Sequence, residues 1–141
     1  MFVDSTGIGW GVHDRLVQLG CPHLVGVDFA GRADRTDPGN AAARYANKRA
    51  EMWDLLKEWC KAGCLPDDRE LAADLSAVEY SYDASDAILL ERKDDMKKRG
   101  LASPDDGDAL ALTFALPVAK RDWAEERRFE EGLARLRRWV V

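Results

Sequence analysis

Residues 2–27 read FVDSTGIGWGVHDRLVQLGCPHLVGV, and their hydrophobic pattern decides the fold class. Residues 2–3 are typical of the end of a strand, residues 10–19 have the apolar spacing of a helix that stops at Gly20, and residues 24–27 are again strand-like. A strand, a helix and a second strand in succession predict an α/β fold.

The rest of the chain continues to alternate helical and extended patterns. Residues 31–40 contain two glycines and a proline, which predicts a long loop. The later elements are predicted, in chain order, as a helix over 41–62, an amphipathic stretch over 67–75, a hairpin over 78–82 and 87–91, a charged turn over 93–99, a buried helix over 104–116 and an amphipathic helix over 119–141. We therefore expect one domain over residues 1–118 and a C-terminal helix that packs on that domain or on a partner.

The composition suits a single small domain. The chain has 141 residues, of which 46% are hydrophobic, and this is enough for one core. The formal net charge of −5 disfavours a general nucleic-acid coat protein, although a local basic groove is compatible with it. No apolar run reaches the length of about 18 residues that marks a membrane span, so we expect a soluble cytoplasmic protein with no membrane partner.

The cysteines favour free thiols. Cys21, Cys60 and Cys64 are an odd number in a chain without a secretion signal, so a disulfide framework is not expected. Cys60 and Cys64 lie four residues apart, which is compatible with two zinc ligands. A zinc site is disfavoured because no second paired motif accompanies them.

Asp4 is the first candidate site residue. It follows the predicted strand and precedes STGIG at residues 5–9, and open α/β sheets bind ligands at the carboxyl ends of their strands. Gly7 and Gly9 allow a tight turn beside it. They also suggest a dinucleotide site, which we disfavour because the GxGxxG pattern is incomplete and the Asp4 carboxylate would repel a pyrophosphate.

Asp105 and Asp108 are the second and third candidates. They lie three residues apart near the start of a predicted helix, on the face that Leu112 continues inward. A carboxylate that leads into a buried apolar face is costly unless it is paired or binds a cation, which is the physical reason to expect a metal. The alternative for Asp105 is that it and Asp106 only complement the positive end of a helix capped by Ser103.

Four segments of the chain carry a family resemblance: VDSTGIGWGVHDRLVQLG (3–20), YANKRAEMWDLL (45–56), LLERKDDMKKRG (89–100) and SPDDGDALALTFALPV (103–118). In this order they resemble the nuclease domain of the large subunit of tailed-phage terminases. Each segment is modest alone, but four in sequence with suitable spacing make a chance match improbable. The resemblance extends over nearly the whole chain up to Val118.

The resemblance implies a ribonuclease H-like fold, with a mixed sheet flanked by helices, that cleaves double-stranded DNA with two divalent cations. It implies that Asp4 matches the family's second acidic position and that Asp105 and Asp108 match its third, whereas Asp106 lies off that pattern. The implied cofactor is Mg²⁺ or Mn²⁺. The implied partners are double-stranded DNA and other terminase or portal components, in the cytoplasm of the host cell.

The chain departs from the family pattern at its start, because the family's first acid lies on an earlier strand and its ATPase domain precedes the nuclease. We therefore expect a fold that is incomplete at the N-terminus, weak or no cleavage by the isolated chain, and a sheet edge open to self-association. Two alternatives stay open: a decayed prophage remnant, or a non-catalytic module that binds DNA or the packaging motor through Lys93, Lys97, Lys98 and Arg99. Asp28 is expected to be a surface acid at a strand end rather than a third ligand.

Overall fold

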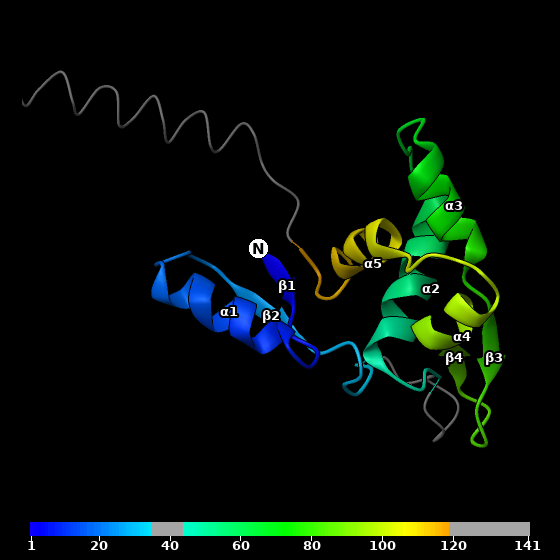
Figure 1. Ribbon diagram of the computed structural model, residues 1–141, viewed down its shortest axis with the longest axis horizontal. Helices are drawn as coiled ribbons and strands as arrows, with labels where there is room; N and C mark the ends of the chain where they lie inside the picture. The colour runs from blue at the N-terminus through cyan, green and yellow to red at the C-terminus, as the bar shows by residue number, and fades with distance from the viewer. Residues whose placement is uncertain (35–43, 119–141) are drawn as a thin grey trace, which may run out of the picture.

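The computed structural model describes residues 1–34 and 44–118 and shows an α/β fold (Figure 1). The predicted helix over 119–141 and part of the predicted loop lie outside these residues. The elements are, in order, β1 (Phe2–Asp4), α1 (Gly9–Gln18), β2 (Val25–Val27), α2 (Lys48–Cys60), α3 (Arg69–Ala77), β3 (Tyr80–Tyr82), β4 (Ile88–Leu90), α4 (Lys93–Lys98) and α5 (Asp105–Leu112).

The strands form one parallel and one antiparallel pair within the described residues. β1 pairs in parallel with β2, with Asp4 opposite Val27, and the backbone N–H of Ser5 continues the ladder by donating to the Val27 carbonyl at 2.9 Å. β3 and β4 form the predicted hairpin, with Tyr80 opposite Leu90. The predicted α/β class with mixed strand directions is confirmed, and its sheet is divided into two small parts.

The first three elements form a strand–helix–strand unit in which α1 covers the β1–β2 pair (Figure 1). α1 begins at Gly9, where a Cβ atom would overlap the Asp4 carbonyl, so only glycine allows the helix to start this close to the strand. The helix stops before Gly20, whose φ of +75° suits glycine. No residue of α1 is buried.

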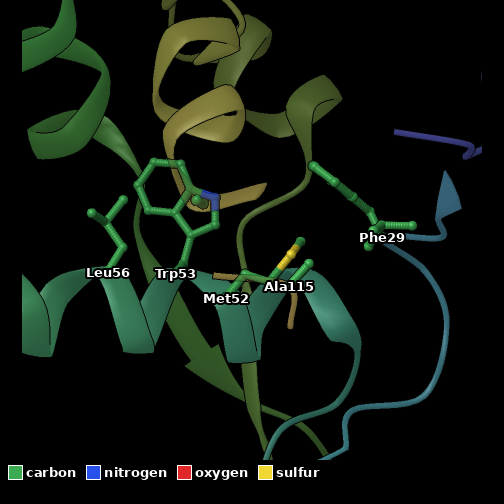
Figure 2. Close-up of a cluster of buried hydrophobic side chains, with 7 residues drawn as sticks. Phe29, Met52, Trp53, Leu56 and Ala115 are labelled. Carbon is green, nitrogen blue, oxygen red and sulfur yellow. The ribbon is translucent and has the colours of Figure 1, made fainter. Parts of the chain in front are cut away.

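The hydrophobic core lies between α2 and α5. Figure 2 shows Met52, Trp53 and Leu56 projecting from α2, with Phe29 approaching from the segment after β2. Asn47 caps α2, because its side chain accepts the Ala50 backbone N–H at 2.9 Å. These buried aromatic and aliphatic side chains hold α2, α5 and the end of β2 together.

α5 packs against α2 and α3 and also contacts β1, so it lies between the two halves of the molecule (Figure 1). It has no side-chain cap of its own. A carboxylate oxygen of Asp74 on α3 instead accepts the backbone N–H groups of Asp106 and Gly107 at 3.0 and 3.1 Å. The start of α5 is therefore fixed by a neighbouring helix.

Several predicted details were wrong. The helix expected over 104–116 ends at Leu112 because the chain turns there, and Leu116 is 43% exposed. The stretch predicted as a charged turn is the helix α4. The helical spacing of the aromatic residues over 41–62 predicts Trp59 as a core residue, but it is 41% exposed near the end of α2, where its ring packs edge to face on Phe114. The expected cap Ser103 instead donates its hydroxyl to the Asp105 carboxylate.

Within the described part of the chain, no helix is long and apolar enough to cross a membrane.

Candidate functional site

Asp108 is the most enclosed of the three candidate acids. Its side chain is 7% exposed and lies on the first turns of α5. One oxygen, Oδ1, accepts a hydrogen bond from Arg49 Nε at 2.9 Å and another from Trp53 Nε1 at 2.8 Å. The other oxygen, Oδ2, lies 2.9 Å from Lys93 Nζ as an ion pair without hydrogen-bond geometry. Asp108 is therefore buried together with the positive charges that burial of a carboxylate requires.

Lys93 links Asp108 to Asp105. Its ammonium is 3.3 Å from Asp105 Oδ1 as well as within reach of Asp108. Burial lowers the pKa of Lys93, but the interaction with Asp108 and then with Asp105 outweighs burial, so the net pKa is raised. Asp105 itself is 79% exposed. The Ser103 hydroxyl, with smaller help from Lys93, holds the pKa of Asp105 below its ordinary value against the opposing effect of burial.

Asp4 lies at the carboxyl end of β1, as predicted, and is exposed. Its Oδ1 accepts the Thr6 backbone N–H at 2.8 Å, which fixes the turn after the strand. The Thr6 hydroxyl accepts the Phe29 N–H at 2.9 Å and lies 3.5 Å from Asp28 Oδ1, at the end of the neighbouring strand. Asp4 and Asp28 thus occupy corresponding ends of two parallel strands, and Asp28 is exposed as expected.

The structure brings Asp105 and Asp108 together around Lys93, whereas the contacts of the Asp4 side chain lie within the β1–β2 edge. In residues 1–34 and 44–118, no group of three or more His, Cys, Asp or Glu side chains is placed so that it could hold a metal ion. All three cysteines are free thiols, as predicted.

Sequence reasoning missed the residues that hold Asp108. Trp53 lies in the helix predicted over 41–62 and was not a candidate site residue, and Lys93 was predicted only as part of a basic face. The available signal was the spacing of Arg49 and Trp53, which lie one helical turn apart on one face of a predicted helix. Of the other residues in that basic face, Lys98 pairs with Asp95 at 2.7 Å and Arg99 pairs with Glu91 at 2.9 Å.

Comparison with known proteins places this geometry within a known fold. No protein-family model and no curated protein matches the chain. The nuclease domain of the large terminase subunit gp2 of bacterial virus Sf6 superposes with a TM-score of 0.65 at 19% identity, over 83% of this chain and 65% of that one. The chain has the fold of that nuclease domain.

Two structures of a lysine-to-alanine mutant of the same Sf6 domain give similar results. The form with manganese has a TM-score of 0.66 and the form with calcium 0.67, each at 18% identity and over 82% of this chain. The present chain spans 65% and 64% of the length of those domains. The predicted resemblance to a terminase nuclease is thus confirmed for the fold.

Proposed function

We propose that this chain is a nuclease domain that hydrolyses DNA for viral DNA packaging, with Mg²⁺ or Mn²⁺ as its cofactor. The observation that carries the proposal is Asp108, a buried carboxylate at the start of α5 in a fold shared with a viral nuclease domain. The Sf6 domain with manganese and the one with calcium support a divalent cation as the cofactor. Double-stranded DNA is the proposed substrate, and other packaging components are the proposed partners.

The carboxylate chemistry of the proposed ligands suits a hard cation. Carboxylate oxygens are the ligands that Mg²⁺ and Mn²⁺ prefer. Asp105 and Asp108 share the Lys93 ammonium and Asp108 also pairs with Arg49, so a metal ion would have to displace Lys93 to bind both acids. Asp4 is the proposed third ligand. A bound divalent cation would stabilise the negative charge that develops on the phosphate during hydrolysis.

Titration with Mn²⁺ tests the metal site. Binding should be saturable and should weaken in Asp4→Asn and in Asp105→Asn, because each change removes a negative oxygen ligand while nearly keeping the side-chain shape. The chain offers a matched control for each. Asp28 lies at the neighbouring strand end and Asp106 is next to Asp105 on α5, so Asp28→Asn and Asp106→Asn should bind Mn²⁺ as the unsubstituted chain does. Equal binding by all four variants would refute the assignment.

Nicking of supercoiled plasmid DNA in Mn²⁺ tests the activity. Each tenfold loss of rate corresponds to about 1.4 kcal/mol of barrier. A site with too few acids should cleave DNA slower by several factors of ten. We expect slow or no cleavage by the chain alone and faster cleavage when a fragment with the family's first acidic strand is added. If the plasmid stayed uncut with that fragment present, the result would count against the nuclease function.

A non-catalytic DNA-binding or motor-binding module is the second candidate. The observation that favours a non-catalytic chain is the neutralisation of Asp108 by Arg49 and Lys93, since a purely structural buried acid is stabilised in the same way. The plasmid experiment distinguishes the two functions, since a binding module would retard DNA in a gel, without Mn²⁺, and leave it uncut.

A further inference from the structure

The hairpin of β3 and β4 leaves one strand edge uncovered. Among the described residues β3 pairs only with β4, whereas β4 is also bonded on its other side. There the Ile88 N–H donates to the Arg44 carbonyl, and the Ile88 carbonyl accepts the Ala46 N–H, each at 2.9 Å. β3 is therefore the outer strand, and all of its residues are exposed (Figure 1).

The register of the hairpin shows which backbone groups of β3 point outward. The Glu91 N–H donates to the Glu79 carbonyl at 2.9 Å, so this pair faces inward. Bonded and non-bonded pairs alternate along an antiparallel ladder, and the backbone groups of Tyr80 and Tyr82 therefore point away from β4. The free edge offers two N–H donors and two carbonyl acceptors to a further strand.

A concave pocket lies beside this edge. Tyr80 and Tyr82 are two positions apart, which places their side chains on one face of the strand, and both line a pocket of about 350 Å³. Apolar side chains from α3 and β4 also line it, namely Leu75, Val78, Ile88 and Leu90. A strand added to β3 would place every second side chain beside the tyrosines, at the mouth of this pocket.

The pocket carries one positive charge that is free to pair. Its other charged lining residues form ion pairs within the chain, namely Arg44 with Asp54 and Glu58 with Lys61. Lys57 has no ion-pair partner in residues 1–34 and 44–118, and its ammonium lies 5.8 Å from the centre of the Tyr80 ring. Charge complementarity therefore favours a carboxylate at this place.

We propose that the free edge of β3 is a docking site for an extended peptide of a partner protein. The peptide adds a strand beside Tyr80 and Tyr82, with an acidic side chain toward Lys57 and an apolar one toward the pocket. In this mode main-chain hydrogen bonds supply the affinity and alternate side chains supply the specificity. The site goes beyond the proposed nuclease function, and testing it requires neither metal nor DNA.

Two properties of the edge favour a peptide. Its alternating donors and acceptors match a peptide backbone, whereas a nucleic acid would leave them without regular partners. Exposed edge strands are commonly protected by charged residues or proline. β3 is short, but its sequence is YSY and has neither of these protections.

The first experiment measures peptide binding by fluorescence anisotropy. The probe is a labelled, capped octapeptide that repeats threonine, glutamate, threonine and valine, so glutamate and valine share one face of the extended chain. Saturable binding is expected. The same peptide with N-methyl groups on glutamate and valine has lost the N–H donors that face β3 and should bind more weakly by about tenfold or more. Equal affinity for the two peptides, or no binding of the first, would overturn the proposal.

The second experiment reverses the charge of the pocket. A second probe has lysine in place of glutamate, and the unsubstituted chain should prefer the glutamate probe by about two- to fivefold. Lys57→Glu should prefer the lysine probe. Arg69→Glu is the matched control, because Arg69 is an exposed cation at the start of α3, outside the pocket lining, and it should keep the original preference. An unchanged preference in Lys57→Glu would refute the recognition of an acidic peptide.

The third experiment needs no altered chain. With the glutamate probe on about nine-tenths of the molecules, the amide protons of Tyr80 and Tyr82 should exchange with deuterium about tenfold more slowly. The Ser81 proton, which faces β4, should change little. Unchanged exchange at Tyr80 and Tyr82 would refute strand addition. The same protection caused by a thymidine oligonucleotide, or by concentrating the chain without peptide, would overturn the proposal in favour of a nucleic acid or a second copy.

Discussion

The unit formed by β1, α1 and β2 and the body formed by α2 to α5 differ in how they bury apolar side chains. In the body, Met52 and Leu56 are 0% and 1% exposed. In the first unit, α1 has no buried residue, and Ile8 and Leu19 are 96% and 62% exposed. The body therefore supplies most of the hydrophobic core, to which β2 adds Val27, whereas α1 leaves its apolar surface uncovered.

The two units hold their acids differently for the same reason. Asp108 lies in the body, where neighbouring charges and donors come from two other elements. Asp4 is exposed and is held by one backbone N–H from its own turn. The comparison teaches that Asp108 is held by the packing of several elements, while Asp4 is held only by the turn that follows its own strand.

The largest expected effect is the difference in the free energy of unfolding between variants of these two acids. Asp108→Asn leaves the Arg49 and Lys93 charges without their partner, and breaking a buried ion pair in this way costs about 3–5 kcal/mol. Asp4→Asn keeps the oxygen that accepts the Thr6 N–H and should change the free energy of unfolding by less than about 0.5 kcal/mol. Urea denaturation measures both. Similar losses of stability in the two variants would show that the two acids are held equally firmly.

A second pair of variants compares the hydrophobic surfaces. Leu56→Ala empties a position that is 1% exposed and should destabilise the chain by about 3 kcal/mol through lost contacts and a residual cavity. Leu19→Ala, at the 62% exposed end of α1, should cost less than about 0.5 kcal/mol. If Leu19→Ala lowered the free energy of unfolding of the dilute monomer by a similar amount to Leu56→Ala, α1 would be better packed than its exposure indicates.

The third prediction concerns self-association. Each strand of the β1–β2 pair has one strand partner within the described residues, and α1 adds exposed apolar side chains beside it, so we expect the chain to associate through this unit. Leu19→Glu should weaken the association by about tenfold, in line with about 1.5 kcal/mol or more for one buried leucine. Sedimentation velocity over a range of concentrations measures this.

The control for association lies in the body. Tyr82 on β3 is 59% exposed, which is similar to Leu19, and Tyr82→Glu should leave the association unchanged. An effect of Tyr82→Glu equal to that of Leu19→Glu would place the contact elsewhere.

The smallest expected effect is on the pH dependence of stability, through Asp105. The pKa of Asp105 is held below its ordinary 3.8 in the folded chain, first by the Ser103 hydroxyl. Its stabilising contribution is therefore complete above pH 3.8 and is lost as the pH falls through the lower folded value. The difference in urea midpoint between the unsubstituted chain and Asp105→Asn should shrink on acidification in this range. If the difference in urea midpoint grew on acidification, the pKa of Asp105 would be raised in the folded chain and not lowered.

The predictable parts of the fold were those with local signals. Apolar spacing and Gly20 predicted α1, and the two extended runs around a polar turn predicted the hairpin. The end of α5 was misplaced because residues 114–116 are apolar and fit a continued helix, whereas the chain turns at Thr113, whose backbone N–H and hydroxyl both donate to the Leu110 carbonyl. Short helices such as α4 are poorly marked, because charged residues fit a turn equally well.

The sequence singled out the acids of the candidate site and missed the residues that pair with them. Asp108 could be singled out because a carboxylate on an apolar face needs compensation. The residues that compensate it, Arg49 and Lys93, are 59 and 15 positions away and meet it only through the packing of α2 and α4 beside α5. Such long-range partners have no local pattern in the sequence.

The carboxylate of Asp74 that caps α5 has a dynamic consequence. Because this cap comes from α3, the first turn of α5 cannot keep its N–H groups bonded while α3 is unfolded. The two helices should therefore open as one cooperative unit, and the amide protons of Asp106 and Gly107 should exchange with solvent deuterium at the rate set by the opening of α3. The acidic turn that carries Asp108 is thus as long-lived as its neighbouring helix.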